Sequence, residues 1–558
     1  MLITLLSWLL IFAISLIIGF FLLKICKFGG IKTLDVTILS GMVFLTVYAQ
    51  FFSLFAKVGL LSNLILLLFC IIIGVIYRKD LLVYIMSGAG FSSTTSKHVL
   101  FGITVFIILI SVFLASGPVI QYDTYLYHAQ AIRWIEESGI IPGLGNLHNR
   151  LAYNSSIFSL QALFSFSYLK PYSMHSVNGF FVAFFLLYSV LTLNVFRGQK
   201  LAASDLFKFG LIFYYCFGGV KTYVSSPGSD ILTLSMVLYI AMKWSELCEK
   251  KTGESDDFTH DYGLLSLFAL WAISVKLSSA LMVLLAIYPA IVLIRAKKWR
   301  DITLFVIIGF LIVLPFLTRN VIISGYLLYP YPALDFFSFD WKMPAWIAAY
   351  DSQEIMAYGR SMRNHADYTA PFSTWFPVWY SELTLRYRLL VWLNPFSLLV
   401  CLVYVGFLVK KKVDFPRITL FLVLSANLLM WFFSSPLIRY GMVYLILLPI
   451  LITGVILDKV GDSKRNIIIT YSFTCLILAY CALSMLRHIE VQGKTPLLHP
   501  SDYMVKQCIA VEWQGNYIYL PTDDDRTCYH HFPSTTAAYR LEMIELRGVD
   551  IRSGFRAK

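Results

Sequence analysis

The sequence predicts an all-α membrane protein that crosses the bilayer many times, and three features indicate this. Hydrophobic residues make up 58% of the 558 residues, and the mean hydropathy is +0.72. Only 14% are charged, whereas soluble domains carry roughly a quarter. The basic residues behind the net charge of +13 fall in short clusters between apolar runs, as expected for cytoplasmic loops. We therefore attribute this charge to membrane topology and expect no nucleic-acid partner.

The apolar runs are of near-spanning length and predict about fourteen transmembrane helices. The first run lacks a basic start and a small-residue cleavage site, so we expect a retained helix and not a signal peptide. The two short runs around Lys276 fit either two helices or one re-entrant unit. In chain order the runs cover residues 2–23, 36–55, 59–77, 99–116, 174–196, 205–220, 228–242, 261–275, 277–294, 301–318, 389–409, 418–433, 440–457 and 466–486.

Basic residues occupy every second loop, which predicts the orientation of the chain. These loops should face the cytoplasm, so both chain ends and two long connections, 117–173 and 319–388, should lie on the exported side. The residues concerned are Lys24, Lys27, Lys32, Arg78, Lys79, Lys97, Arg197, Lys200, Lys243, Lys250, Lys251, Arg295, Lys297, Lys298, Arg300, Lys410, Lys411, Lys412, Lys459, Lys464 and Arg465.

The predicted organisation alternates membrane regions with exported ones. Residues 151–170 are apolar on one side and predict an interfacial helix lying on the membrane. Cys508 and Cys528 in the polar tail predict a disulfide in an oxidising compartment, whereas most of the nine cysteines lie in or beside apolar runs. The predicted regions are transmembrane helices at 1–116, a first exported loop with interfacial helices at 117–173, central transmembrane helices at 174–318, an aromatic-rich second exported loop at 319–388, C-terminal transmembrane helices at 389–486 and an exported tail at 487–558.

The long polar stretch at 117–150 is the first candidate site. Its sequence YDTYLYHAQAIRWIEESG predicts a helix entered through Asp123 and Thr124. The structural alternative for Asp123 is a helix cap, but the residue follows a membrane helix and lies among basic and aromatic side chains. Charged residues in that setting indicate a site. The candidate binding residues around Asp123 are Tyr122, Tyr127, His128, Gln130, Arg133, His148 and Arg150.

The segment Asp123-Thr-Tyr-Leu-Tyr127-His128-Ala-Gln130-Ala131 resembles the acidic motif in the first exported loop of GT-C integral membrane glycosyltransferases. That class includes protein O-mannosyltransferases and bacterial aminoarabinose transferases, and the wider stretch is similar to a bacterial branch of it. The resemblance implies transfer of a sugar, with inversion, from a polyprenyl-phosphate donor to a glycan, lipid or protein acceptor. The reaction would take place on the outer face of a bacterial plasma membrane, with Asp123 as general base.

A lipid-phosphate leaving group would need fixed cations at the membrane surface. Lys276 stands between two apolar runs, as a lysine often does in this class, although a snorkelling lysine fits equally. Arg319 and Arg439 lie at outer helix ends, against the positive-inside trend. Arg439 and Tyr440 also resemble an Arg-Tyr pair late in GT-C enzymes. We expect Lys276, Arg319, Arg439 and Tyr440 to bind the donor phosphate, with Arg439 the foremost candidate.

The sequence leaves cofactor use open. Asp230 follows a Pro-Gly break and fits either a cap of the next helix or an acidic residue that binds acceptor or metal. A divalent metal is compatible with the sequence and not required by it, and His128 and His148 predict no zinc site. The run at 523–525 predicts a solvated loop, with weak cation binding as the alternative.

Two other functions use a similar topology. An O-antigen polymerase or ligase would employ basic residues of the second exported loop, here Arg360, Arg363, His365 and Arg386. The early acidic segment and late basic residues match the GT-C order better. A lipid-linked sugar transporter would place ionisable residues near the membrane midplane, whereas those of this chain gather at the outer surface.

Overall fold

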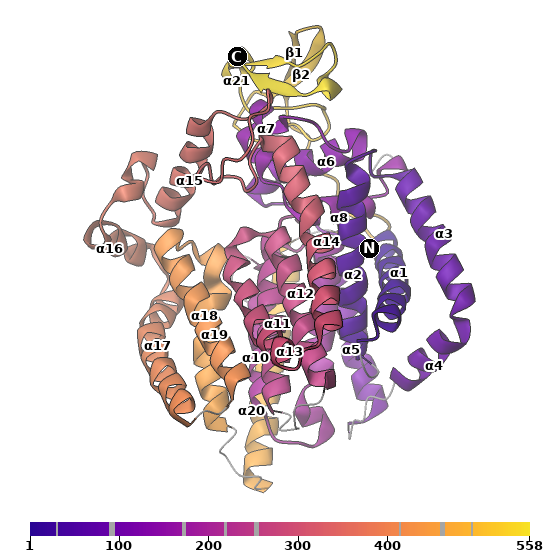
Figure 1. Cartoon of the computed structure of the whole chain (residues 1–558), viewed down its shortest axis with the longest axis vertical. Helices are drawn as coiled ribbons and strands as arrows, with labels where there is room; N and C mark the ends of the chain where they lie inside the picture. Colours follow the sequence, from indigo (N-terminus) through magenta and orange to yellow (C-terminus); the bar gives the residue numbers. More distant parts are fainter. Residues whose placement is uncertain are drawn as a thin grey trace.

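The computed structural model describes residues 1–28, 32–88, 95–169, 174–216, 220–249, 256–411, 414–457, 464–492 and 495–558. Among the basic loop residues used above for orientation, Lys250, Lys251, Lys412 and Lys459 lie outside the described residues. The chain is mostly helical, with a small strand-containing cap at one end (Figure 1).

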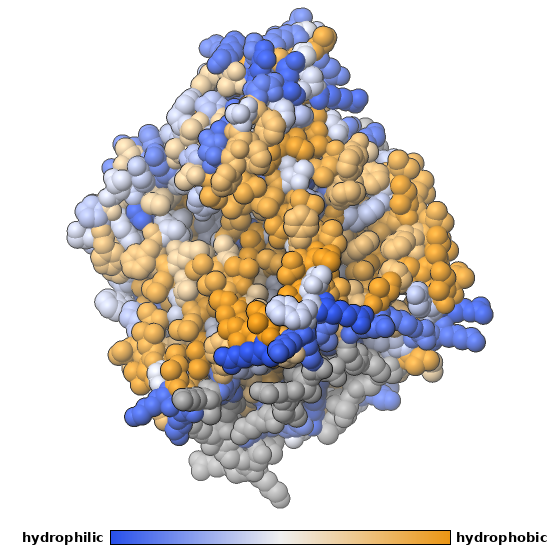
Figure 2. All heavy atoms as spheres, in the orientation of Figure 1, coloured by the Kyte–Doolittle hydropathy of each residue, from blue (hydrophilic) through white to orange (hydrophobic). Residues whose placement is uncertain are grey.

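Ten helices of the described chain are long and apolar enough to cross a membrane, or eleven if the pair α3 and α4, bent by 82°, is one broken span. The chain is thus a multi-pass membrane protein. The space-filling view has an apolar band across the middle of the molecule, with polar residues above and below it (Figure 2). The expected total of about fourteen spans stays a prediction, because α9 and α10 have only 15 and 14 residues and α12 is polar in its first turns.

The bounds of these elements follow the predicted apolar runs closely. The N-terminal and central group comprises α1 (Leu2–Cys26), α2 (Leu34–Ser53), α3 (Leu60–Ile76), α4 (Arg78–Gly88), α5 (Lys97–Ala115), α9 (Val177–Leu191), η4 (Asn194–Arg197), α10 (Ala203–Cys216), η5 (Val220–Tyr223), α11 (Asp230–Glu249), α12 (Asp256–Val275), η6 (Leu277–Ala286), α13 (Ile287–Arg295) and α14 (Trp299–Ser324). The C-terminal group comprises α17 (Leu385–Lys411), α18 (Phe415–Ser434), α19 (Ile438–Leu457) and α20 (Lys464–Gln492).

Ion pairs join helix ends that the loop charges assign to one side. Lys24 at the end of α1 pairs with Asp80 in α4, and Lys32, just before α2, pairs with Asp261 in α12. Lys243 in α11 lies 3.2 Å from Asp35 in α2. These contacts agree with the alternation of loops read from the sequence.

The first two helices pack closely through small residues. A Cβ atom on Gly19 would lie 1.8 Å from the Thr37 carbonyl oxygen, and one on Gly41 would lie 1.9 Å from the Ser15 carbonyl oxygen. Small residues four positions apart on both helices therefore allow the backbones to touch, the arrangement typical of helix pairs in membranes.

The first long connection folds into short helices: η1 (Thr124–His128), α6 (Ala129–Ser138), α7 (Leu144–Leu147), η2 (Asn149–Ala152), α8 (Ser156–Leu163) and η3 (Ser167–Leu169). The prediction that residues 151–170 form a helix lying on the membrane surface is wrong, because the helix found there is buried in the protein. Every residue of α8 is buried, and Ser155 and Ser156 bond to Val275 and Ser274 of α12. The hydroxyls of Ser155 and Ser156 therefore bond within the protein and not to lipid headgroups.

The second long connection carries α15 (Ala345–Gly359), η7 (His365–Thr369) and α16 (Phe372–Glu382). α16 lies to one side of the bundle, above α17 and α18 (Figure 1). Its rings pack in tilted or edge-to-face contact with Phe432 of α18, while Phe372 and Val378 are exposed. This placement agrees with aromatic residues at a membrane boundary.

The tail adds strands to a fold expected to be all-α. β1 (Cys508–Trp513) pairs antiparallel with β2 (Asn516–Pro521), and β3 (Ile544–Leu546) pairs antiparallel with β4 (Phe555–Ala557). Short helices α21 (Ala538–Glu542) and η8 (Ile551–Ser553) complete it. The predicted disulfide between Cys508 and Cys528 is present.

The start of the chain is hydrogen-bonded to the segment that follows α20. The amino group of Met1 donates to the Pro496 carbonyl oxygen at 3.1 Å, and the Leu2 and Ile3 amides donate to the carbonyl oxygens of Leu497 and Leu498. This segment leads directly into the tail, so the start of α1 lies beside the end of α20.

Candidate functional site

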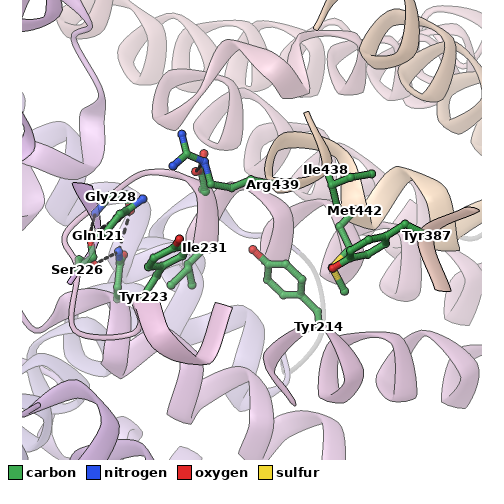
Figure 3. Close-up of a pocket in the computed structure, with 12 residues that line it drawn as sticks. Gln121, Tyr214, Tyr223, Ser226, Gly228, Ile231, Tyr387, Ile438, Arg439 and Met442 are labelled. Atoms are coloured by element: carbon green, nitrogen blue, oxygen red, sulfur yellow. Dashed lines mark hydrogen bonds and ion pairs between the residues drawn. The ribbon is translucent and has the colours of Figure 1, made fainter. Parts of the chain in front are cut away.

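A cavity of about 270 Å³ opens where the ends of α10, α11, α17 and α19 meet the first long connection. In Figure 3, Gln121, Ser226 and Gly228 lie on one side of Arg439, and Tyr387, Ile438 and Met442 lie on the other. The cavity is therefore polar at one end and largely apolar at the other. Its walls are formed by Gln121, Asn178, Tyr214, Tyr223, Ser226, Gly228, Asp230, Ile231, Tyr387, Ile438, Arg439 and Met442.

Two charged side chains that line this cavity, Asp230 and Arg439, are paired with two others from distant segments, Lys276 and Asp123. Arg439 Nη2 donates to Asp123 Oδ2 at 2.6 Å, and Arg439 Nε lies 3.4 Å from Asp230 Oδ2. Lys276 Nζ donates to Asp230 Oδ1. Two carboxylates are thus balanced by two cations. Each of these side chains keeps 16 to 27% of its surface exposed, so a ligand can reach the cluster.

Tyr440 completes the cluster from the residue next to Arg439. Its hydroxyl accepts a hydrogen bond from Arg439 Nη2 at 3.1 Å, and Lys276 Nζ lies 3.7 Å from the centre of its ring. A cation over an aromatic face is attracted to it. Tyr440 therefore holds the two cations side by side.

Local backbone structure explains why Asp123 reaches the cluster. The helix predicted to start at Asp123 begins with a π-turn, η1, and among the described residues the Asp123 side chain makes no capping hydrogen bond. The alternative of a simple helix cap is therefore wrong. Single π-turns occur frequently at functional sites. Here the Asp123 carboxylate is not used for capping and accepts a hydrogen bond from Arg439.

Asp230 is the first residue of α11, and Lys276 stands in an extended conformation between α12 and η6. The break at Lys276 therefore separates two helices at the level of the cluster. Arg439 lies in the first turn of α19. All three residues are at helix ends on the side of the long connections.

The loop before Asp230 is tied to the segment before Asp123. Asn178 Nδ2 donates to the carbonyl oxygens of Ser226 and Gly228 at 2.6 and 2.7 Å, and Ser226 bonds to Gln121 and Thr124. Sequence reasoning missed Gln121, Asn178, Ser226, Tyr214 and Tyr387 as cavity residues. The Pro-Gly break next to Ser226 was the only available signal.

His128 and Tyr127 lie behind Asp123 and are buried or half-buried. Burial lowers the pKa of His128 from 6.5 to about 4, although Asp123 and Asp230 act in the opposite direction. Burial likewise raises the pKa of Tyr127 well above its ordinary value. Both side chains are therefore neutral at pH 7 and give the cluster a weakly polar back wall.

Three candidate residues of the same segment contact the tail, away from the cavity. Gln130 Nε2 donates to the Cys528 carbonyl oxygen at 2.8 Å, Arg133 donates to the Tyr529 carbonyl oxygen, and the Tyr122 hydroxyl donates to Asp525. The hydrogen bond to Asp525 raises the pKa of Tyr122 to about 12. The structure thus places them in a contact within the chain.

Three further candidates lie apart from the cluster. Arg150 Nη2 lies 2.5 Å from Glu354 Oε2 and joins the first connection to α15. His148 is 2% exposed, and burial lowers its pKa well below the ordinary value. Arg319 is 3% exposed and donates to Asn154 and Ser53, with no carboxylate partner among the described residues. Its hydrogen-bond partners therefore lie outside the cluster.

The sequence matches, over residues 1–446, the family described as domain of unknown function (DUF8201). The chain belongs to this family. No curated protein and no solved structure matches it. The DUF8201 region contains Asp123, Asp230, Lys276, Arg439 and Tyr440, whereas the tail lies beyond it.

In the charged cluster of the DUF8201 region, each carboxylate has at least one basic partner. Asp230 is shared between Lys276 and Arg439, and Asp123 is bonded to Arg439. In the part of the chain that the structure describes, no group of three His, Cys, Asp or Glu side chains could hold a metal ion. The cluster brings two cations and two carboxylates together at one place.

Proposed function

We propose that the protein is a glycosyltransferase of GT-C type, which moves a sugar from a polyprenyl-phosphate donor to a hydroxyl acceptor on the exported face of a bacterial plasma membrane. The observation that supports this most strongly is the ion-paired cluster of Asp123, Asp230, Lys276 and Arg439, of which Asp230 and Arg439 line the cavity. The donor would be held by cations and the acceptor activated by a carboxylate.

The shape of the cavity supports a lipid-linked donor. Its volume of about 270 Å³ is near the lower end of ligand sites, which span roughly 300–1,000 Å³. A sugar phosphate fits that space and a polyprenyl chain does not. The polyprenyl chain of the donor would leave the cavity along its apolar end at Tyr387, Ile438 and Met442, where α17 and α19 begin.

The proposed chemistry follows from charge. The acceptor oxygen attacks the anomeric carbon, the bond from that carbon to the phosphate oxygen breaks, and the acceptor proton passes to Asp123. The donor phosphodiester carries one negative charge, and the released phosphate carries more. Arg439 and Lys276 therefore attract the leaving group more strongly than the bound donor, and such differential binding accelerates a reaction.

The alternative functions have less support. Among the basic residues expected for a polymerase or ligase, Arg360 is bonded to the carbonyl oxygens of Tyr368 and Phe433, while Arg363 and His365 lie on the surface. A transporter would hold its ionisable residues near the midplane, whereas Asp230, Lys276 and Arg439 occupy helix ends on one side.

A transfer assay tests the proposal. Purified full-length protein is incubated with a panel of polyprenyl-phosphate sugars and with lipid, glycan and peptide acceptors, and the remaining donor is measured by mass spectrometry. We expect one donor to be consumed with release of polyprenyl phosphate. Joining of polyprenyl-linked glycans without consumption of any monosaccharide donor would favour the polymerase, and no reaction of either kind would contradict the proposal.

A further inference from the structure

The part of the tail that follows α20, residues 495–558, contacts the backbone of the turn that follows Asp123. The Thr527 amide and hydroxyl both donate to the Tyr125 carbonyl oxygen, at 2.9 and 2.5 Å. Tyr125 lies inside the π-turn η1. The tail lies directly over α6 and α7 (Figure 1). Two donors from the tail thus reach a carbonyl that belongs to the turn itself.

Contacts on both sides of Asp123 extend this attachment. Tyr122, the residue before it, donates to Asp525, and Gln130 donates to the Cys528 carbonyl oxygen. The Tyr125 hydroxyl accepts from the Met504 amide at 3.1 Å. Residues 525–528 therefore form a strip along the segment that carries Asp123.

The strip is fixed by the disulfide. Cys528 is 1% exposed and is joined to Cys508 at the start of β1. Asp524, in the loop that this bond closes, pairs with Arg526 of the same loop and with Lys506 just before it. A disulfide restricts the open forms of the loop that it closes. The bond therefore keeps Thr527 and its neighbours against η1.

We propose that the tail, closed by the disulfide between Cys508 and Cys528, is a positioning element that holds the η1 turn and so directs the Asp123 carboxylate to Arg439. The positioning residues are Thr527 in the tail and Gln130 in α6. The effect on catalysis rests on the proposed function, whereas the restraint on η1 does not. Lys276 and Arg439 stand on other elements, so loss of the restraint affects proton acceptance by Asp123 more than binding of the donor.

Hydrogen exchange tests the restraint without any assay of activity. The full-length Cys508→Ser/Cys528→Ser variant is compared with the wild type and with Cys475→Ser, which removes an exposed free cysteine of α20. We expect faster exchange over residues 122–133 in the double variant alone, with unchanged exchange in α18 and α19. Unchanged exchange over 122–133 overturns the proposal.

Kinetics with the donor test the catalytic consequence. Because small misplacement of a reacting group is costly, we expect kcat to fall at least about tenfold in the double variant, with KM for the donor within about twofold of the wild type. Faster exchange with unchanged kcat would show that the tail restrains the segment without positioning Asp123, and would overturn that part. If the wild type turns over no donor, the proposed function fails. The hydrogen-exchange data alone then decide whether the tail restrains η1.

A milder pair of variants guards against misfolding of the double variant. Thr527→Val removes the hydroxyl donor to Tyr125 and keeps the backbone donor, and Thr527→Ser keeps both. We expect lower kcat at unchanged donor KM in Thr527→Val and near wild-type kcat in Thr527→Ser. Equal values in these two variants would remove the assigned role of Thr527.

Discussion

Arg439 and Asp123 are joined by a 2.6 Å hydrogen-bonded ion pair across 316 residues of sequence. The same guanidinium lies 3.4 Å from Asp230, so one cation is divided between two carboxylates. In the proposed reaction, this ion pair keeps Asp123 beside the phosphate that Arg439 and Lys276 bind.

Replacement of Arg439 should weaken binding of the donor. Arg439→Gln removes a charged bidentate donor, and we expect the Kd for a polyprenyl phosphate to rise at least about tenfold. The measurement is native mass spectrometry or a thermal shift with the lipid. Arg363→Gln, which changes an exposed arginine of the second long connection, is the matched control. Equal affinity of the two variants would exclude Arg439 from the phosphate site.

Asp230 and Lys276 should be coupled in stability. In Asp230→Asn, Lys276 loses its carboxylate partner, whereas in Lys276→Met, Asp230 retains Arg439. We therefore expect Asp230→Asn to cost more free energy of unfolding than Lys276→Met. The double variant should cost less than the sum, with a coupling of about 0.5–3 kcal/mol. Additive losses in detergent unfolding experiments would contradict the ion pair.

Stability should fall on acidification because of His128. Its pKa is about 4 in the folded protein and near 6.5 in the unfolded chain. Between these values the unfolded chain binds more protons, so the free energy of unfolding rises with pH. Acidification from pH 6.5 to 4 should therefore destabilise the wild type through this residue, by at most about 3 kcal/mol.

His128→Gln provides the comparison for that prediction. The variant lacks the titrating ring, and the other histidines and the carboxylates are unchanged, so its unfolding temperature should fall less steeply below pH 6.5. Parallel curves for the two proteins would show that burial does not hold His128 neutral.

The sequence predicted those features of the site that depend on local patterns, and it did not predict contacts between segments far apart in the chain. The chemistry of Asp123, Asp230, Lys276, Arg439 and Tyr440 was visible, since a charged residue beside an apolar run is unusual. Loop charges indicated that the segments share one side of the membrane. Their pairing beside a cavity required the packing of α10, α11 and α19, which no local pattern reports.

The remaining candidates show what sequence could not provide. Gln130 and Arg133 have the polar character of ligand-binding residues, but the tail, nearly 400 positions later, uses them. Arg319 lies at a helix end as expected, yet its side chain turns to Asn154. The burial of α8 depends on α2 and α12, because the same alternation of polar and apolar residues suits a lipid surface and a protein interior.

The contact between α1 and α2 should not tolerate a methyl group. In Gly41→Ala the new Cβ would lie 1.9 Å from the Ser15 carbonyl oxygen, so the helices must separate, and we expect a loss of about 1–3 kcal/mol. Gly74→Ala is the matched control, because a Cβ at Gly74 of α3 meets nothing within 4 Å. Thermal unfolding in detergent measures both. Equal stability of the two variants would contradict the close approach.

The central claim is that Asp123 accepts the proton of the acceptor at the site where Arg439 and Lys276 hold the donor. The most direct measurement is release of polyprenyl phosphate from the bound donor by wild type, Asp123→Asn and, as a control, Asp523→Asn in the tail, each at matched donor occupancy. We predict that Asp123→Asn lowers the rate at least about a hundredfold while Asp523→Asn does not. Equal rates for Asp123→Asn and the wild type would contradict the account.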